Sequence, residues 1–402
     1  MGKVTRIGLL FMTGCVFAWF GITALQPLAP EVLSIRIQKM SGIPDEEAGF
    51  SLGVSACYAG IVDNQLLMAG GCNFPEVPVA DGGTKRFYQG IYAANLTADS
   101  TLAWRKIGDL PVPAAYGVTV SIPGGLILVG GMNANGSLSS VYRLLLSKNK
   151  KSVTIDTLRS LPYPMDNLAG TLMDNTLYVV GGNVKGKPSN CLYSYLYTDP
   201  RSAWTEEPSF PGDARVQPVC AGQSAKGMLY VWGGFAPYVE GKSATVSTGG
   251  YVYSLAQRTW TPLSAPVGND FVPVSLGGGC AWTLNDSLIV CTGGVNEKVF
   301  LSGLQRDELL KKDIAANHME RVDSLTGAGK IYLSHPADWY RFNKKILVYN
   351  TLRNVWMERG QSPALARAGA ALVGYDKILY SINGELKPGI RTPEINKIKI
   401  DN

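Results

Sequence analysis

An apolar run ending in Gly-Gly recurs along the chain and divides it into repeats. The runs LLMAGG, LILVGG, LYVVGG, LYVWGG and LIVCTGG end at Gly71, Gly131, Gly182, Gly234 and Gly294. A sixth run, ILYSINGE, carries Asn383-Gly384 in place of the glycine pair. Because each run has the length of a buried strand and ends in turn-forming residues, the pattern predicts six repeats built from short strands.

Aromatic residues follow the glycine pairs at similar places. A Tyr lies in the next strand-like run of five repeats, and a Trp follows it in four of them (Tyr92 with Trp104, Tyr142 alone, Tyr193 with Trp204, Tyr253 with Trp260, Tyr349 with Trp356). This is the kelch pattern, in which each repeat forms a four-stranded sheet that buries its faces only against neighbouring sheets. The sequence therefore predicts an all-β fold, a six-bladed kelch-type β-propeller with aromatic residues between the blades.

The two ends of the chain are expected to complete one blade together. After Gly384 only one strand-like segment remains, EINKIKI, while IRIQKMSGIP near the other end parallels AWRKIGDLP of the following repeat. A strand near residues 35–39 should therefore pair beside one near residues 395–400, which removes the exposed edges that an open ring would leave. This closure gives a single propeller domain over residues 25–402.

A long interval interrupts the fifth repeat, at about residues 301–342. Within it the segment LQRDELLKKDIAA has the polar character of an exposed helix, with Asp307/Lys311 and Glu308/Lys312 spaced for pairing one turn apart. This insertion is either a lid or a decorated loop, and the simpler second interpretation is slightly favoured.

The first residues have the features of an export signal. Lys3 and Arg6 precede the apolar run IGLLFMTGCVFAWFGITAL, which predicts a signal peptide over residues 1–24, cleaved after Ala24. A lipid anchor at Cys15 and an uncleaved membrane anchor are the alternatives. The expected location is the periplasm of a Gram-negative bacterium.

Composition and charge narrow the function. Gly accounts for 46 residues and only 17% of residues are charged, which favours strands and turns over helices. The net charge of +6 includes no basic run longer than KNKK, so a nucleic-acid partner is not expected, whereas a small acidic ligand is compatible. No stable membrane partner is expected either, and the sequence leaves open whether the chain forms a homodimer.

Residues that could bind metals or form disulfides are sparse. Six cysteines lie beyond Cys15 and none forms a C-x-x-C pair, so free buried thiols are the expected state, although Cys280 and Cys291 could face each other across a hairpin. His318 and His335 both lie in the insertion, which argues against a copper oxidase, and a sialidase Ser-x-Asp-x-Gly-x-Thr-Trp box is absent. No metal or cofactor is expected.

Polar residues should gather at one end of the propeller. The loop that enters the first strand of a blade and the loop that leaves the second lie at the same end, which is the default place for a site. The residues concerned are Asn73, Asn133, Asn183, Phe235, Asn296 and Glu385 after the glycine pairs, and Glu47, Tyr116, Asn167, Arg215, Gln217 and Arg367 before the first strands. An Asn in such a turn also serves turn geometry alone. Glu385 with Arg391 favours a site, with a buried salt bridge as the alternative.

Three segments carry a resemblance to a known family. GGVNEKVF, INGELKPGIRT and FPGDARVQP resemble segments of bacterial N-acetylneuraminate epimerases (sialic acid mutarotases), which are six-bladed kelch propellers. The first two follow AGGCNF here and precede it in better-known members, which is the order of the cyclically permuted mutarotases. The resemblance implies an isomerase that interconverts the anomers of an acidic sugar, N-acetylneuraminate, by acid/base ring opening and without a cofactor.

The resemblance also implies roles for individual residues. Glu385 corresponds to the proposed proton acceptor, and Arg391 to an arginine of the catalytic site. Arg215, Gln217 and Asn296 fall on matching positions and are expected to bind the substrate.

Some assignments stay open at the level of sequence. Asn73 and Lys387 are further candidates for substrate binding, and the general acid is Lys387, a Tyr or water. Ala114 stands where some relatives have Arg, which puts substrate contacts from that blade in question. The alternative function is a non-catalytic kelch propeller that binds a glycan or a protein.

Overall fold

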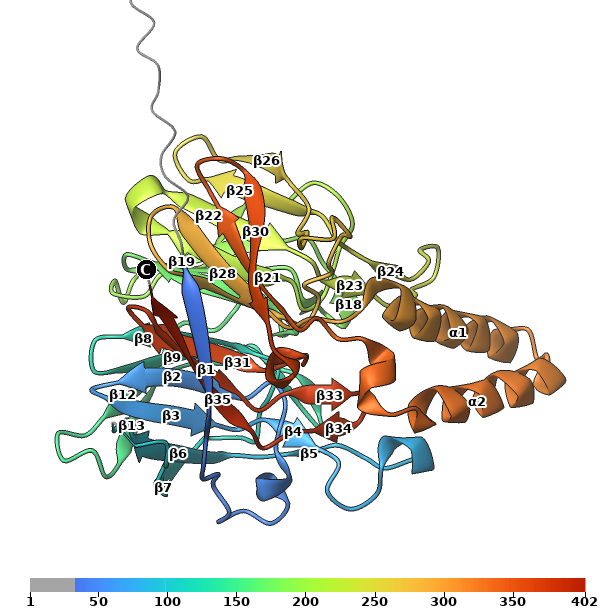
Figure 1. Cartoon of the computed structure of the whole chain (residues 1–402), viewed down its shortest axis with the longest axis horizontal. Helices are drawn as coiled ribbons and strands as arrows, with labels where there is room; N and C mark the ends of the chain where they lie inside the picture. The colour runs from blue at the N-terminus through green and yellow to red at the C-terminus, as the bar shows by residue number, and fades with distance from the viewer. Residues whose placement is uncertain (1–32, 98, 402) are drawn as a thin grey trace, which may run out of the picture. The chain divides into compact units, whose positions relative to one another are not determined.

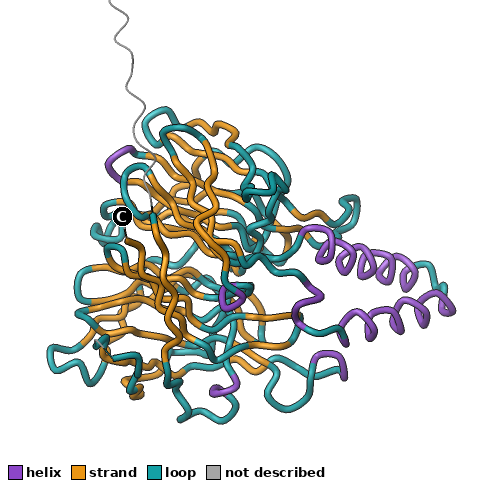
Figure 2. Tube along the Cα trace, viewed as in Figure 1, coloured by secondary structure: helices purple, strands orange, loops and turns teal. Residues whose placement is uncertain are grey.

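The structure is a computed structural model that describes residues 33–97 and 99–401. The predicted signal segment, residues 1–24, lies outside the described residues. Strands and turns make up most of the described chain, and the two long helices lie in one segment (Figure 2). The expectation of an all-β protein with few helices is confirmed.

The described residues contain six four-stranded antiparallel sheets. In chain order they are β2 (Tyr58–Val62), β3 (Gln65–Ala69), β6 (Gly90–Asn95) and β7 (Trp104–Asp109); β8 (Val118–Ile122), β9 (Gly125–Val129), β12 (Val141–Leu146) and β13 (Val153–Thr157); β15 (Ala169–Met173), β16 (Thr176–Val180), β19 (Leu192–Leu196) and β20 (Thr205–Glu207); β21 (Val219–Gln223), β22 (Met228–Trp232), β25 (Gly250–Ser254) and β26 (Thr259–Leu263); β27 (Cys280–Thr283), β28 (Leu288–Thr292), β29 (Lys345–Asn350) and β30 (Val355–Gln361); and β31 (Ala371–Tyr375), β32 (Ile378–Ile382), β35 (Ile395–Asp401) and β1 (Ser34–Met40).

Short strands lie between the second and third strands of five of the sheets, and one further short strand, β14, lies just before the first strand of its sheet. They are β4 (Cys72–Asn73) with β5 (Arg86–Phe87), β10 (Met132–Asn133) with β11 (Gly136–Ser137), β14 (Met165–Asp166) with β17 (Asn183–Val184) and β18 (Lys187–Pro188), β23 (Phe235–Ala236) with β24 (Thr245–Val246), and β33 (Glu385–Lys387) with β34 (Ile390–Arg391). A glycine pair directly precedes β4, β10, β17 and β23, and Asn383-Gly384 precedes β33. At Gly131 φ is 105°, and a Cβ atom would lie 2.2 Å from the Tyr58 hydroxyl, so glycine is required there.

The last sheet contains both ends of the described chain. β1 pairs with β35 in antiparallel register, with Ile35 opposite Ile400 and Lys39 opposite Asn396. The pairing expected from the sequence is therefore present. Ile398 and Ile400 are buried in a cluster with Leu288 and Val290 of the preceding sheet, so the shared sheet also packs against its neighbour.

The first strands of the six sheets contact one another in chain order, and β31 also contacts β2. Just before each first strand, one residue has a left-handed backbone, and these residues are joined by backbone hydrogen bonds of 2.7–3.0 Å that form a closed cycle. In donor-to-acceptor order the cycle runs Ala56, Gly369, Gly278, Gln217, Asn167, Tyr116 and back to Ala56. We call these residues the hydrogen-bond cycle.

Aromatic side chains fill the space between neighbouring sheets, as the repeat predicts. Trp232 of β22 is fully buried, and its ring centroid lies 4.9 Å from that of Tyr349 and 5.2 Å from that of Trp356, both in the next sheet. Edge-to-face contacts of this kind add to the free energy gained by burying the rings.

The insertion is a helical hairpin of α1 (Glu297–Ala315) and α2 (Met319–Ser334), followed by a short 3-10 turn (Ala337–Tyr340). The two helices pack together and project from the sheets on the side of β23, β24 and β33 (Figure 1). The predicted helix is confirmed within α1, with Glu308 and Lys312 paired at 2.6 Å, whereas Asp307 pairs with Arg306 at 2.7 Å. The second helix was not predicted, and the insertion begins slightly earlier than expected.

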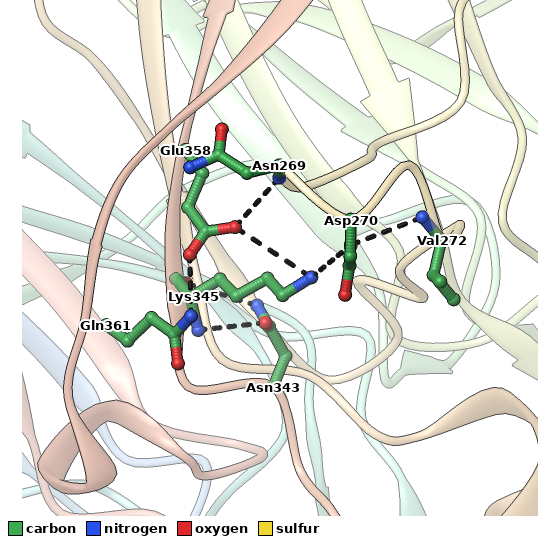
Figure 3. Close-up of polar contacts among 7 residues, drawn as sticks. All are labelled: Asn269, Asp270, Val272, Asn343, Lys345, Glu358 and Gln361. Carbon is green, nitrogen blue, oxygen red and sulfur yellow. Dashed lines mark hydrogen bonds and ion pairs between the residues drawn. The ribbon is translucent and has the colours of Figure 1, made fainter.

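A cluster of polar side chains attaches the loop that precedes β27 to the strands β29 and β30 (Figure 3). The Lys345 ammonium lies 2.6 Å from the Asp270 carboxylate and 3.9 Å from that of Glu358. Glu358 also accepts hydrogen bonds from the Asn269 backbone at 3.0 Å and from the Gln361 side chain at 2.7 Å. These contacts satisfy the charges of a nearly buried Glu358 and hold the connection against its sheet.

The six cysteines of the described chain are free. Cys280 lies opposite Thr292 in the β27–β28 register, and Cys291 lies opposite Ala281, so the pairing considered for the two thiols is not formed. No helix of the described residues is both long and apolar enough to cross a membrane.

Candidate active site

Glu385 and Arg391 lie opposite each other on the β33–β34 hairpin. The turn contains Pro388 and Gly389, and Gly389 has a φ of 84° that a glycine adopts without strain. The Gly389 backbone N–H donates to Glu385 Oε1 at 2.7 Å. The Gly/Pro-rich segment therefore places one carboxylate and one guanidinium on the same face of a two-stranded hairpin.

Arg391 is buried in a polar and aromatic pocket. Its side chain is 3% exposed, its Nε donates to Ser55 Oγ at 3.1 Å, and its guanidinium carbon lies 5.0 Å from the ring centroid of Phe74. Burial alone would lower the pKa of Arg391, but the Glu385 carboxylate and the Tyr116 phenol raise it, so the guanidinium is charged. This is a fixed positive charge at the wall of the site.

The contact between the two side chains is an ion pair without hydrogen-bond geometry. Arg391 Nη1 lies 3.2 Å from Glu385 Oε1, yet Nη1 makes no hydrogen bond to any described residue. The Glu385 side chain is 24% exposed and so reaches solvent. The pair thus combines a solvent-accessible carboxylate with a buried, charged guanidinium.

The pair adjoins the hydrogen-bond cycle. Ser55, the partner of Arg391, immediately precedes Ala56 of the cycle, and Glu385 exchanges backbone hydrogen bonds of 2.7 and 2.9 Å with Ala368, which precedes Gly369. A cavity of about 200 Å³ is lined by all six residues of the cycle, namely Ala56, Tyr116, Asn167, Gln217, Gly278 and Gly369. Glu385 and Arg391 flank this cavity and do not line it.

Gln217 lines the cavity. Its Nε2 donates to Asn167 Oδ1 at 2.7 Å, and Asn167 Nδ2 donates to Asp166 Oδ1 at 2.6 Å. Asp166 is 3% exposed and also accepts from Asn183 at 2.7 Å and from Ser137. Asp166 was missed at the level of sequence, although its place just before Asn167 matches that of Ser55 just before Ala56.

Arg215 does not meet the pair. Its Nε donates to the Asp213 carbonyl at 3.1 Å, and its Nη1 donates to the Gly233 carbonyl at 3.1 Å and to Ser247 Oγ at 2.7 Å. Arg367, at the equivalent place in the last repeat, makes the same kind of bond to the Asn383 carbonyl at 2.7 Å. Both arginines hold the backbone at the start of a glycine pair.

Three further candidates form hydrogen bonds that hold loops and helix ends. Asn73 is 3% exposed, donates to the carbonyls of Gly49 and Gly53 at 2.8 and 2.9 Å, and accepts from Tyr88 at 2.8 Å. Asn296 caps α1 by accepting from the Val299 backbone at 3.1 Å. Lys387 Nζ donates to the carbonyls that end α2, Leu333 at 3.1 Å and His335 at 2.6 Å. None of these hydrogen bonds within the described chain involves Glu385 or Arg391.

Two side chains beside the pair were not assigned a role from the sequence. Tyr116, expected at this end of the fold, lines the cavity, and Lys85 Nζ lies 4.6 Å from the centroid of its ring. The sequence gave no indication of a role for Lys85, because this residue lies in the loop between β4 and β5 and the repeat pattern does not determine the path of that loop.

A family model described as N-acetylneuraminate epimerase matches residues 28–155 and 158–402. The chain belongs to the N-acetylneuraminate epimerase family. Similar proteins include the N-acetylneuraminate epimerase of Salmonella typhi, 32% identical over 246 residues that span 61% of this chain and 59% of the relative. That of Pasteurella multocida (strain Pm70) is 34% identical over 233 residues, 58% of this chain and 56% of the relative. The resemblance seen in the sequence is confirmed.

A solved structure is also similar. The chain titled "Structure of YjhT" has a TM-score of 0.50 and 27% sequence identity, over 60% of this chain and 64% of that chain. In each of these comparisons the matched region spans less than two thirds of the relative's length. The described residues are all-β with few helices, consistent with a β-propeller.

Proposed function

We propose that this protein interconverts the α and β anomers of N-acetylneuraminate by acid/base opening and reclosing of the sugar ring. The observation that carries the proposal is the pairing of solvent-accessible Glu385 with buried Arg391 beside a cavity, on the motif that resembles the family's catalytic segment. Membership of the N-acetylneuraminate epimerase family supports the same reaction.

The chemistry of the two side chains suits a keto-sugar acid. Glu385 takes the proton of the anomeric hydroxyl as general base, and the ring carbon–oxygen bond then breaks to give the open-chain ketone. Arg391 binds the sugar carboxylate through its planar, charged guanidinium. Gln217 contributes an amide from the cavity wall. Arg215, Asn73, Asn296 and Lys387 hold the loops that shape the site.

The proposed scaffold is a closed, six-bladed kelch propeller in which β1 and β35 share the last blade. The six sheets, the contacts between their first strands and the hydrogen-bond cycle support it. The alignments with similar proteins cover only about 60% of the chain. This coverage fits a cyclic permutation, because a sequential alignment can follow only one of two segments whose order is exchanged. We further propose that the protein acts in the periplasm after removal of residues 1–24.

Anomer exchange can be measured directly. A sialidase that retains configuration releases α-N-acetylneuraminate, and its anomeric NMR signals are followed with the protein, without it, and with the Glu385→Gln variant. The expected result is faster equilibration with the parent protein than in buffer, with most of the gain lost in the variant. If the parent binds the sugar but equilibrates it no faster than buffer, the chain is a non-catalytic glycan-binding propeller.

A further inference from the structure

Tyr116 is held in an unusual backbone conformation at the cavity wall. Its φ is 62°, a left-handed value that a bulky aromatic residue rarely adopts. Two bonds of the hydrogen-bond cycle maintain it: Tyr116 N–H donates to the Ala56 carbonyl at 3.0 Å, and the Tyr116 carbonyl accepts from Asn167 at 2.8 Å. Backbone strain of this kind concentrates at functional sites.

The position brings the phenol next to the catalytic pair. Gly369, Ala56 and Tyr116 are consecutive members of the cycle. Glu385 is bonded to the residue before Gly369, and Arg391 to the residue before Ala56. Tyr116 therefore lines the cavity close to the pair, and it interacts electrostatically with both members.

Two cations face Tyr116. Lys85 Nζ lies 4.6 Å from its ring centroid, and the Arg391 guanidinium approaches from the hairpin. Burial raises the pKa of Tyr116, the Cys72 thiol adds to this effect, and the charges of Lys85 and Arg391 oppose it. The phenol is thus protonated at neutral pH, and a phenolate formed during a reaction would have two positive neighbours.

We propose that Tyr116 is the general acid of ring opening and that Lys85 stabilises the phenolate it leaves. This role rests on the proposed function. Tyr116 would touch the substrate at the ring oxygen, while Glu385 and Arg391 engage the anomeric hydroxyl and the carboxylate. Tyr116 lies in the cavity wall and the pair lies beside the cavity, which lets the three groups act on adjacent atoms of one sugar.

The proton transfers balance. Glu385 accepts the proton of the anomeric hydroxyl, the C–O ring bond breaks with its electron pair passing to the ring oxygen, and Tyr116 donates its proton to that oxygen. The products are the open-chain ketone, a neutral Glu385 and a Tyr116 phenolate. After rotation about the carbon chain the hydroxyl returns its proton to Tyr116 as it attacks the other face of the ketone, and Glu385 protonates the new anomeric oxygen. Since a phenol is a stronger acid than a sugar alcohol, the donation is favourable.

The other candidate general acids form hydrogen bonds with backbone carbonyls of the insertion. Lys387 Nζ donates to the carbonyls of Leu333 and His335. Tyr332 of α2 donates its hydroxyl to the Val299 carbonyl at 3.4 Å, and the Arg306 guanidinium covers its ring at 4.7 Å. Of the three, Tyr116 is the one that lines the cavity.

The test compares Tyr116→Phe and Lys85→Met with a matched pair elsewhere. Lys185 Nζ lies 4.0 Å from the ring centroid of Tyr163, so Tyr163→Phe and Lys185→Met make the same chemical changes away from the pair. We expect Tyr116→Phe to lower kcat for anomer exchange by about 10²–10⁴-fold, the range for loss of a general acid, with KM changed less than about threefold. Lys85→Met should lower kcat by a smaller factor, since the phenol remains but its anion is less stable. The control variants should match the parent.

Each outcome of these kinetic measurements either supports or rejects Tyr116 as the general acid. If the parent is active and Tyr116→Phe is equally fast, Tyr116 is not the acid while the proposed function stands. If KM rises as much as kcat falls, Tyr116 only binds the sugar and the acid role is rejected. If the parent never exceeds buffer, the proposed function fails and the role of Tyr116 fails with it. Should circular dichroism show that Tyr116→Phe is misfolded, an unchanged kcat in Lys85→Met rejects the proposal and a lowered kcat at unchanged KM supports it.

Discussion

At the scale of single residues, the charge of Glu385 can be removed with little change in shape. Glu385→Gln keeps an oxygen that can accept from the Gly389 backbone, so the hairpin should persist. The neutral amide cannot accept a proton, and the rate of anomer exchange should fall by about 10²–10⁴-fold. NMR of freshly released α-N-acetylneuraminate measures the rate, and calorimetric titration measures binding. A variant as fast as the parent would make Glu385 a structural residue.

Arg391 should contribute recognition more than chemistry. Arg391→Lys keeps the positive charge but loses the Nε bond to Ser55, the contact with the Phe74 ring and the planar fork for a carboxylate. Because hydrogen bonds to charged groups contribute about 1.5–3 kcal/mol, KM should rise roughly 10–100-fold with a smaller change in kcat.

The matched control for this substitution is another cross-strand pair. Arg143 contacts Asp156 at 2.7 Å between β12 and β13 and is partly exposed, so Arg143→Lys should leave KM unchanged. Equal kinetics for Arg391→Lys and the parent would remove Arg391 from the binding site.

The sequence could predict that Glu385 and Arg391 lie together, but not which polar neighbours interact with them. Glu385 and Arg391 were identifiable because a short hairpin leaves their relative position little freedom. Arg215 and Asn73 occupy the expected end of the fold, yet their N–H groups are used by backbone carbonyls of neighbouring loops. Chain direction determines where a residue lies, whereas the partners of a side chain depend on loops that no repeat pattern describes.

At the scale of elements, Lys387 links the catalytic hairpin to the insertion. It lies two residues after Glu385 on β33, and its ammonium binds the last carbonyls of α2, a place where a cation also complements the helix dipole. Lys387→Met should increase amide hydrogen exchange in α2 and the following turn, measured by mass spectrometry. Lys330→Met, an exposed change on α2 itself, is the control. Unchanged protection in Lys387→Met would show that the bond contributes nothing to holding the helix.

The attachment of α1 should depend on pH through Glu308. This buried carboxylate accepts from Lys312 at 2.6 Å and from the Ala244 backbone at 2.9 Å, and these two bonds lower its pKa below the ordinary value of 4.5. Because the folded-state pKa is lowered, the stabilisation is present above about pH 4.5 and is lost as the pH falls through the folded-state pKa.

Limited proteolysis of α1 by pepsin, with hydrogen exchange at neutral pH, measures this dependence. In the parent the helix should become more cleavable as the pH falls from the ordinary carboxyl pKa of 4.5 through the lowered folded-state pKa of Glu308. Glu308→Gln, which cannot ionise, should be less protected at neutral pH and should show a smaller change on acidification. Identical pH profiles for parent and variant would rule out Glu308 as the titrating group.

The two helices of the insertion differ in how well the sequence reveals them. α1 carries pairs one turn apart and strong helix formers, and it was predicted. α2 contains Gly327 and Gly329, which each disfavour a helix by up to about 1 kcal/mol, and so gave no signal. Its packing against α1 and the Lys387 bond explain why it forms despite this sequence.

At the scale of the whole molecule, the repeat pattern predicted that a strand near residues 35–39 pairs with one near residues 395–400. This pairing of β1 with β35 can be tested with an engineered disulfide. Gln38 lies opposite Lys397, and directly paired residues of antiparallel strands have Cα atoms about 4.5–5.5 Å apart, within the range of a disulfide. Gln38→Cys with Lys397→Cys should therefore oxidise within one chain. In the proposed closed propeller this bond would join two residues that are far apart in the sequence.

The consequence is a large gain in stability if the ends are paired in solution. A cross-link across a loop longer than about 100 residues stabilises by roughly 5 kcal/mol through the entropy of the unfolded chain, so the oxidised variant should have a higher Tm than its reduced form. Gln38→Cys with Lys399→Cys is the control, because Lys399 lies opposite Arg36 and a pair two residues out of register is about 7–8 Å apart. Non-reducing electrophoresis and thermal unfolding give the answer. Disulfides that form only between chains, or equally well in both variants, would mean that β1 does not hold its register beside β35 and that the ring is not closed there.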